Sequence, residues 1–238
     1  MKVSLIRCAS TRNTRIFALF LILLPNFSFL IPNSSFLIPN SSFLFPHSLY
    51  AQNRPDALQE YRNGNFERSI EICKNEIAAN PRNIESHVVL CWSLIRLGRY
   101  SEAMTYARAG RNISRYDVRI AEILGEICYY QGQNNEALQY FQEYVNLAPE
   151  GTRIDTVYYF LGEVYIRLGR FRHADIALTT AVHWVPGNAM WWTRLAYARE
   201  NAGDLKEAVT AYEKALSLDS QLSDARRGLD RCRQALTR

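Results

Sequence analysis

Histidine and cysteine are scarce in this chain, with four and five among 238 residues. These are the residue types that most often bind metals or perform acid–base and redox chemistry. No C-x-x-C or H-E-x-x-H spacing occurs, and there is no G-x-x-x-x-G-K-[ST] phosphate loop or G-x-S-x-G nucleophile elbow. We therefore expect no catalytic residue, no metal, no cofactor and no small-molecule substrate.

Acidic residues are absent from the first 51 positions, which carry Lys2, Arg7, Arg12 and Arg15. The rest of the chain has 24 basic and 23 acidic residues, so it holds only about +1 of the total charge of +5. The basic balance thus belongs mainly to the N-terminus. A nucleic-acid-binding domain needs a basic patch on its folded part, so we expect no nucleic-acid partner.

The N-terminal 51 residues have the pattern of an export segment. A cationic stretch ends at Arg15, and Ile16 to Leu24 are nine consecutive apolar residues. That length fits a signal-peptide core and is short for a bilayer span. A near-perfect heptapeptide follows in three copies, which end at Pro32, Pro39 and Pro46. Proline at every seventh position would interrupt a helix, so we interpret residues 1–51 as a signal peptide or an N-terminal membrane anchor.

Ala51, followed by Gln52, is a plausible cleavage point, although Leu49 is not ideal at the third position before the cut. Cys8 precedes the apolar core and so cannot be a lipoprotein cysteine. Cleavage, an uncleaved anchor and a misassigned start codon all remain open. We expect an exported protein that is periplasmic, or anchored through this segment and facing the periplasm.

Regularly spaced glycines reveal an internal repeat. They are Gly64, Gly98, Gly132, Gly169 and Gly203, at intervals of 34, 34, 37 and 34 residues. Five residues beyond each glycine stands a small residue: Ser69, Ala103, Ala137, Ala174 and Ala208. Seventeen residues beyond three of them stands a proline: Pro81, Pro149 and Pro186. Self-similarity at such a period is the signature of a stacked repeat architecture.

The period and its residues resemble the tetratricopeptide repeat, a helix-turn-helix unit of 34 residues. The fourth copy agrees best with that family, through Tyr158, Leu161, Gly162, Tyr165, Gly169, Phe171, Ala174, Leu178, Ala181 and Pro186. The first copy agrees least, because its first helix is short. The resemblance covers about residues 54–220.

This resemblance implies an all-α fold, a right-handed α-solenoid of about five helix-turn-helix repeats with a C-terminal capping helix. The predicted repeats, within residues 52–220, are about 52–82, 83–116, 117–150, 151–187 and 188–220, and the capping helix is 221–238. Small residues at the helix contacts allow close approach, and the glycines can adopt a left-handed cap. The 37-residue interval places three extra residues near Glu150 to Thr152, as a longer loop.

In the tetratricopeptide family, one stripe of each first helix lines a concave groove. Carried onto this sequence, the stripe predicts partner-binding residues at Arg62, Trp92, Arg96, Tyr129, Tyr130, Tyr159, Arg167 and Tyr197. Tyr, Trp and Arg are the types enriched at interface hot spots. The alternative is that several of the aromatic residues only fill the seam between helices. Glu126 and Glu163 also fall on the groove, where a carboxylate usually pairs with a neighbouring or incoming cation.

The leading interpretation is a binding module whose groove takes a protein or peptide partner, as an extended segment or a helix. Resemblance to exported repeat proteins implies a role in envelope assembly or secretion. The alternative is a structural component that self-associates or tethers a complex. One subset of the family grips carboxylates with a clamp that uses asparagine where Leu58 and Val89 stand here, so no chaperone partner is inferred. A disulfide between Cys73 and Cys91 is left open.

Overall fold

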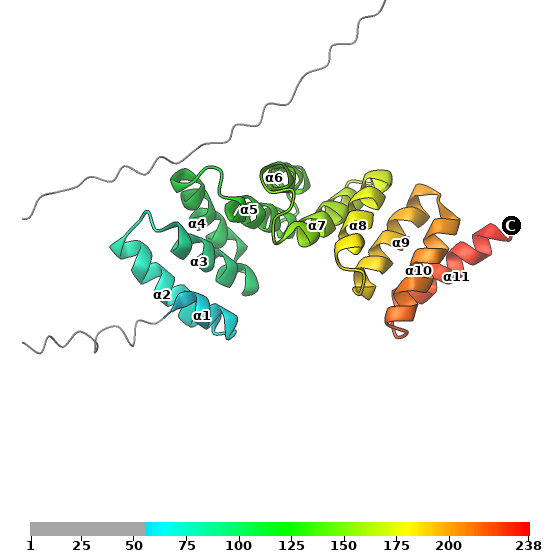
Figure 1. Ribbon diagram of the computed structural model, residues 1–238, viewed down its shortest axis with the longest axis horizontal. Coiled ribbons are helices and arrows are strands. Elements are labelled where there is room, and N and C mark those ends of the chain that lie inside the picture. Colours follow the sequence, from blue (N-terminus) through cyan, green and yellow to red (C-terminus); the bar gives the residue numbers. More distant parts are fainter. Residues whose placement is uncertain (1–55) are drawn as a thin grey trace, which may run out of the picture. The chain divides into compact units, whose positions relative to one another are not determined.

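The computed structural model describes residues 56–238, which form eleven helices and no strand (Figure 1). The helices are α1 (Ala57–Arg62), α2 (Phe66–Ala79), α3 (Ile84–Arg96), α4 (Tyr100–Ile113), α5 (Val118–Tyr130), α6 (Asn134–Leu147), α7 (Ile154–Arg167), α8 (Phe171–Trp184), α9 (Ala189–Ala202), α10 (Leu205–Leu218) and α11 (Ser223–Leu236). Five hairpins, α1–α2 to α9–α10, precede the single helix α11. The predicted all-α solenoid with a capping helix is therefore confirmed. The predicted export segment, residues 1–51, lies outside the described residues.

Each hairpin turns at one of the periodic glycines. All five have positive φ, between 68° and 88°, a region that glycine enters without the steric cost of a Cβ atom. At the α3–α4 turn, the Gly98 amide donates to the Ile95 oxygen and the Arg99 amide donates to the Leu94 oxygen, at 3.0 and 2.9 Å. These bonds pair carbonyls that the end of a helix leaves free.

Small residues let the two helices of a hairpin approach closely. A Cβ atom on Gly125 of α5 would lie 2.6 Å from the Phe141 ring of α6, and one on Gly162 of α7 would overlap the Leu178 side chain of α8. Phe141 and Leu178 are fully buried. The large side chain of the second helix thus occupies the space that the glycine leaves open.

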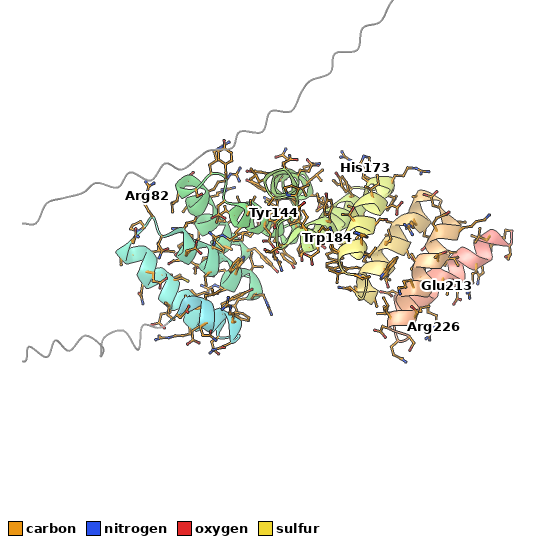
Figure 2. The ribbon with its side chains drawn as sticks, in the orientation of Figure 1. Arg82, Tyr144, His173, Trp184, Glu213 and Arg226 are labelled. Atoms are coloured by element: carbon orange, nitrogen blue, oxygen red, sulfur yellow. The ribbon has the colours of Figure 1, made fainter. Side chains whose placement is uncertain are left out.

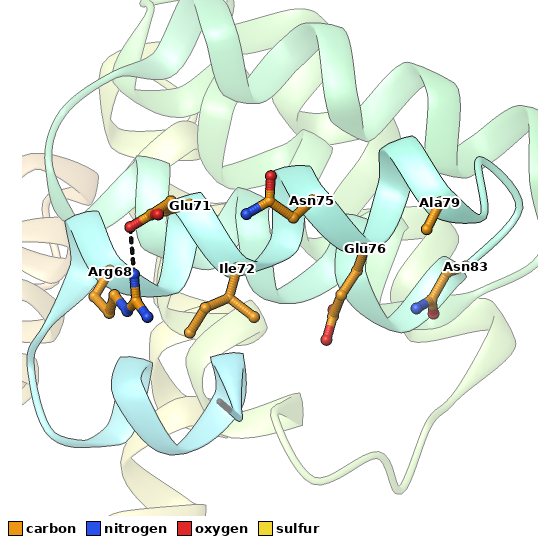
Figure 3. A pocket seen from close by; sticks show the side chains of 7 residues that line it. All are labelled: Arg68, Glu71, Ile72, Asn75, Glu76, Ala79 and Asn83. Atoms are coloured by element: carbon orange, nitrogen blue, oxygen red, sulfur yellow. Dashed lines mark hydrogen bonds and ion pairs between the residues drawn. The ribbon is translucent and has the colours of Figure 1, made fainter. Parts of the chain in front are cut away.

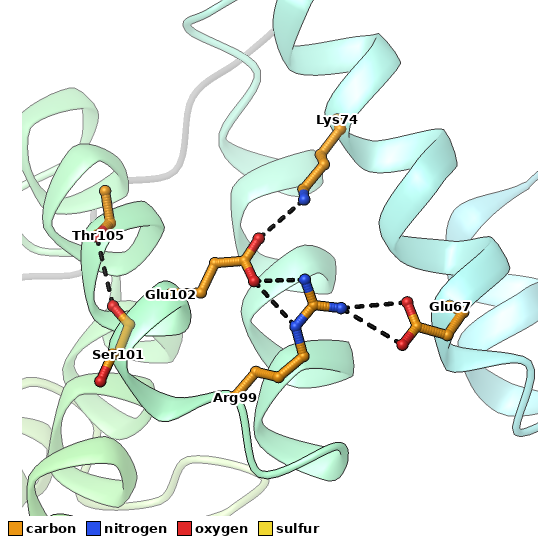
Figure 4. A network of polar contacts seen from close by, with 6 residues as sticks. All are labelled: Glu67, Lys74, Arg99, Ser101, Glu102 and Thr105. Carbon is orange, nitrogen blue, oxygen red and sulfur yellow. Dashed lines mark hydrogen bonds and ion pairs between the residues drawn. The ribbon is translucent and has the colours of Figure 1, made fainter.

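The first helices form one layer and the second helices form another. The backbones of α1, α3, α5, α7, α9 and α11 touch in succession, whereas those of neighbouring second helices do not. Long side chains join α2 to α4 instead (Figure 4). Arg99 pairs with Glu67 at 3.1 Å and also with Glu102, and Lys74 reaches Glu102 at 2.8 Å. The closer layer of first helices is the concave side, where the groove was predicted.

The extra residues of the third interval lengthen one connection. Six residues, 148–153, separate α6 from α7, whereas four separate the other second helices from the next first helix. The buried Tyr144 (Figure 2) holds this loop, because its hydroxyl accepts a 3.2 Å hydrogen bond from the Arg153 backbone amide. A Cβ atom on Gly151 would lie 2.5 Å from that hydroxyl, so the loop packs tightly on α6.

Helix α11 closes the C-terminal end of the array. Leu229 and Cys232 are buried against α9 and α10. Arg231 pairs with Glu200 of α9 at 2.7 Å, and the Tyr212 hydroxyl of α10 donates to the same carboxylate at 2.7 Å. The opposite face of α11 is charged and exposed. The helix therefore covers the apolar end of the last hairpin and presents polar groups to water, as the end of a solenoid requires.

Candidate functional site

All eight predicted partner-binding residues lie on the layer of first helices, in α1, α3, α5, α7 and α9. The exposed ones are Arg62, Arg96, Tyr130 and Arg167, and the half-buried ones are Trp92, Tyr129, Tyr159 and Tyr197. The aromatic rings therefore contribute to the packing between helices and also keep part of their surface open. Whether they bind a partner stays a prediction.

Tyr129, Tyr130 and Arg167 come together at the centre of the layer. The Arg167 guanidinium lies 3.6 Å from the Tyr129 ring centre, and its Nη1 donates to the Tyr129 backbone oxygen at 2.7 Å. Tyr130 stacks on Tyr100 of α4, with ring centres 4.9 Å apart, and meets Tyr129 edge-on. These contacts hold three of the predicted residues in fixed orientations.

Trp92 and Arg96 belong to a separate cleft of about 330 Å³ nearer the N-terminal end of the array. Its lining residues are Tyr61, Trp92, Ile95, Arg96, Glu126 and Arg153. The Tyr61 and Trp92 rings lie 5.8 Å apart and form one wall. The Arg96 guanidinium lies 5.0 Å from the Phe66 ring centre, within the range of a cation–π contact.

The remaining predicted aromatics lie toward the C-terminal end. Tyr159 of α7 stacks on Trp191 of α9 at 5.0 Å, and burial raises the pKa of its hydroxyl, with the Glu163 charge adding to the effect. Tyr197 meets the edge of Phe171 and lies beneath the Arg194 guanidinium at 5.2 Å. Tyr197 also lines a second cleft of about 300 Å³ between α9 and α11. The eight residues thus form three groups along the layer.

An acidic pair forms the inner side of the Trp92 cleft. Glu122 and Glu126 stand one turn apart on α5, with side chains 3% and 15% exposed. Arg153, from the longer loop before α7, reaches both of them. Its Nε lies 2.6 Å from Glu122 Oε1 and its Nη2 lies 3.3 Å from Glu126 Oε1. One guanidinium therefore serves two buried carboxylates.

This excess of negative charge changes how the pair binds protons. Burial, and next the charge of Glu122, raise the pKa of Glu126 to about 7, although Arg153 opposes the shift. Burial also raises the pKa of Glu122. Two carboxylates so close titrate as a unit. Near neutral pH the pair with Arg153 exchanges one proton with solvent, because the single guanidinium cannot balance both charges.

The cations that hold the groove carboxylates were missed by sequence reasoning. Glu126 and Glu163 were placed on the groove, but their partners Arg153 and Arg194 were not. Arg194 of α9 binds Glu163 of α7 through Nε at 2.5 Å and Nη2 at 2.9 Å. For Arg153 a signal existed, since it directly follows the three inserted residues. For Arg194 no local pattern points to the carboxylate 31 residues earlier.

The largest cavity, about 450 Å³, lies on the outer side of α2 (Figure 3). Ile72, Glu76 and Ala79 contribute to its lining. Helix α1 has six residues, whereas the later first helices have 13 or 14. In the part of the chain that the structure describes, the second half of α2 therefore has a smaller neighbour than the other second helices. The hollow follows from that difference and contains none of the predicted groove residues.

Residues suited to metal binding or redox chemistry are scattered and buried. Within residues 56–238, no group of three or more His, Cys, Asp or Glu side chains could hold a metal ion. The ring nitrogens of His87 lie 3.2 and 3.1 Å from the backbone oxygens of Tyr106 and Pro81. Cys73 and Cys91 are buried and free, so the disulfide that the sequence left open is not formed. No helix in this range has the length and apolar character needed to cross a membrane.

Family models described as tetratricopeptide repeat match residues 118–150, 155–185 and 189–222. These segments cover the hairpins α5–α6, α7–α8 and α9–α10. Hairpins α1–α2 and α3–α4 continue the same architecture toward the N-terminus. The matches support the tetratricopeptide family, which the 34-residue period predicted.

Two curated relatives are similar in sequence. A BBSome complex member BBS4 homolog from Drosophila melanogaster is 30% identical over 134 residues, which is 53% of this chain and 28% of that protein. The TPR repeat-containing protein MJ1428 from Methanocaldococcus jannaschii is 25% identical over 189 residues, 74% of this chain and 32% of that protein. The chain thus spans about a third or less of the length of these relatives.

Solved structures share the fold at low identity. YrrB, described as a TPR protein with an unusual peptide-binding site, superposes with a TM-score of 0.64 at 16% identity and covers 71% of this chain and 85% of its own. PilW, described as a widely conserved type IV pilus biogenesis factor, gives a TM-score of 0.65 at 18% identity over 76% of this chain and 83% of its own. These likenesses establish the solenoid fold.

Proposed function

We propose that this chain of tetratricopeptide repeats is a binding scaffold that holds a segment of a partner protein, extended or helical, against its first helices. The central cluster of Tyr129, Tyr130 and Arg167 carries the proposal. Its side chains are fixed by contacts within the chain, yet Tyr130 and Arg167 remain exposed. Fixed aromatic and arginine side chains lose little conformational entropy when a partner binds.

The likeness to YrrB, described as having a peptide-binding site, supports the same kind of ligand here. A stacked array of hairpins presents one continuous surface, and an extended peptide of about ten residues, at about 3.3 Å per residue, would reach several first helices.

The finer part of the proposal places the scaffold in cell-envelope assembly or secretion. Two observations support this. Residues 1–51 have the cationic and apolar pattern of an export segment, and one structural neighbour is described as a pilus biogenesis factor. In this proposal the segment directs the repeats to the periplasm, either by cleavage or by remaining as a membrane anchor.

A cross-linking pull-down of the full-length chain from its own cells tests the groove. The test variant is Trp92→Ala with Tyr130→Ala, and the matched control is Trp184→Ala with Tyr116→Ala. The control removes the same residue types from α8 and the α4–α5 connection, where they are 52% and 70% exposed. We expect the groove variant to lose the partner while it remains folded by circular dichroism. Equal capture by the groove variant and the wild-type chain would contradict the groove assignment.

Self-association through the second helices is the alternative. It is favoured by two large apolar residues on α8, Ile176 and Trp184, which are 68% and 52% exposed (Figure 2 labels Trp184). Light scattering of the full-length chain and of Ile176→Asp distinguishes the two functions. A dimer that dissociates in Ile176→Asp, with capture lost in the Trp184/Tyr116 control, would favour the alternative. A monomer with groove-dependent capture supports the scaffold.

A further inference from the structure

The Trp92 cleft combines features that select one kind of ligand group. Tyr61 and Trp92 provide an aromatic wall, Ile95 adds apolar surface, and Glu126 presents a carboxylate that is 15% exposed. The cleft volume of about 330 Å³ is larger than one long side chain. An aromatic wall beside a carboxylate is the arrangement that binds cations, because the ring faces and the carboxylate both carry negative potential.

The local charges also favour a cation. The charged and titratable groups around Glu126 are Glu122 and Tyr130 of α5, Arg96 of α3, Tyr61 of α1, and Arg153 and Asp155 at the start of α7. Arg153 is already bound by both carboxylates, and Arg96 lies over the Phe66 ring. Asp155 adds negative charge near Glu122. The inner side of the cleft therefore has more carboxylates than cations that neutralise them.

We propose that this cleft takes a lysine or arginine side chain of the bound protein segment, with its cationic end against the Glu126 carboxylate and its stem along the Trp92 ring. This inference rests on the proposed scaffold function and adds a chemical preference to one position of the groove. The stem of a basic side chain is apolar and its end is charged, which matches Ile95 and Trp92 on one side and Glu126 on the other.

Proton release should accompany this binding. The cation binds the ionised form of Glu126, whose pKa is raised to about 7 in the unbound protein. Below that pH the ligand must displace a proton, so affinity falls by up to about tenfold for each pH unit. Above it, the affinity for an arginine-containing segment stays level, because a guanidinium keeps its charge to above about pH 12.

Random-peptide display against the full-length chain at pH 8 tests the preference without knowledge of the partner. The selection is repeated with Glu126→Gln and with Glu143→Gln, a matched control on α6 whose carboxylate pairs with Arg111 at 2.7 Å. We expect wild type and Glu143→Gln to enrich peptides with a lysine or arginine at one position, and Glu126→Gln to lose that enrichment. Enrichment of acidic or purely apolar peptides would overturn the proposal.

Synthetic peptides then measure the coupling. The enriched peptide and its version with norleucine in place of the basic residue are titrated at pH 6 and pH 8 by isothermal calorimetry. We expect the basic peptide to bind the wild type about tenfold more weakly at pH 6, and the norleucine peptide and Glu126→Gln to show no such change. Peptides that need Trp92 and Tyr130 but no basic residue would contradict the cleft proposal alone. A chain that selects no peptide contradicts both proposals.

Discussion

Arg167 of α7 lies flat over the Tyr129 ring of α5, 3.6 Å from its centre, and donates to the Tyr129 backbone oxygen at 2.7 Å. The last carbonyls of a helix have no partner within the helix, and Arg167 supplies one at the end of α5. The same side chain therefore ends one first helix, orients an aromatic ring of the groove and links two successive repeats.

Arg167→Ala should lower the free energy of unfolding by about 1–2 kcal/mol, because it removes a cation–π contact and a hydrogen bond of about 1 kcal/mol. Arg167→Lys should recover only part of the loss, since an ammonium group lacks the planar face. Urea unfolding measures both. Arg108→Ala, an exposed arginine of α4, is the control and should change stability by less than about 0.5 kcal/mol. Equal effects of Arg167→Ala and Arg108→Ala would show that the contact adds nothing.

Gly162→Ala should destabilise the α7–α8 hairpin by about 1–2 kcal/mol. The added Cβ atom would overlap Leu178, and overpacking costs more than the helix propensity that alanine gains over glycine. Gly187→Ala is the control, because no atom lies within 4 Å of its Cβ position. Combining Gly162→Ala with Leu178→Ala should show a favourable coupling energy in thermal unfolding. Additive effects would mean that the two residues do not share the space.

Glu126→Gln should flatten the pH dependence of stability between about pH 5 and 7. The folded chain keeps a proton on the Glu122–Glu126 pair that the unfolded chain has lost, because the folded pKa of Glu126 is raised from 4.5 to about 7. The free energy of unfolding of the wild type should therefore fall as pH rises through this window, by up to about 1.4 kcal/mol per pH unit. Urea titrations at pH 5, 6, 7 and 8 compare it with Glu143→Gln. A slope in Glu126→Gln equal to that of the control would contradict the assignment.

Glu200→Ala should release the capping helix. Glu200 accepts hydrogen bonds from Arg231 of α11 and Tyr212 of α10, and these outweigh the effect of burial, so that its folded pKa is lowered. A lowered carboxyl pKa contributes stability that is present above the unfolded value of 4.5 and is lost as pH falls through the folded value. Hydrogen exchange of α11 amides should therefore speed up several-fold in the variant at pH 7, and in the wild type only below about pH 4.

Glu213→Ala is the comparison for that experiment, since Glu213 also pairs with α11, through Arg233, but both side chains are at least half exposed. An exposed pair contributes little, so the α11 amides should exchange as in the wild type. If both variants exchange equally fast, the buried carboxylate has no special role in holding the cap.

The sequence predicted the fold because its signals are local and repeated. Five glycines at near-constant intervals mark the turns, and each has the positive φ that such a turn requires. Gly125 and Gly162 could be recognised as contact positions because their helices must approach closely. The side-chain groupings depend on contacts between repeats, which no single period contains. Stacking of Tyr159 on Trp191 and the reach of Arg153 to α5 follow from the curvature of the stack and the path of one loop.

The six-residue connection 148–153 also makes the repeats unequal as a measuring scale. In an array of identical steps, a bound strand could shift by one unit and find the same contacts again. Here one step is longer, and its arginine is delivered to a single pair of carboxylates. Positions before and after this step are no longer interchangeable, so a segment that places its cation against Glu126 is fixed in one frame and one direction along the array.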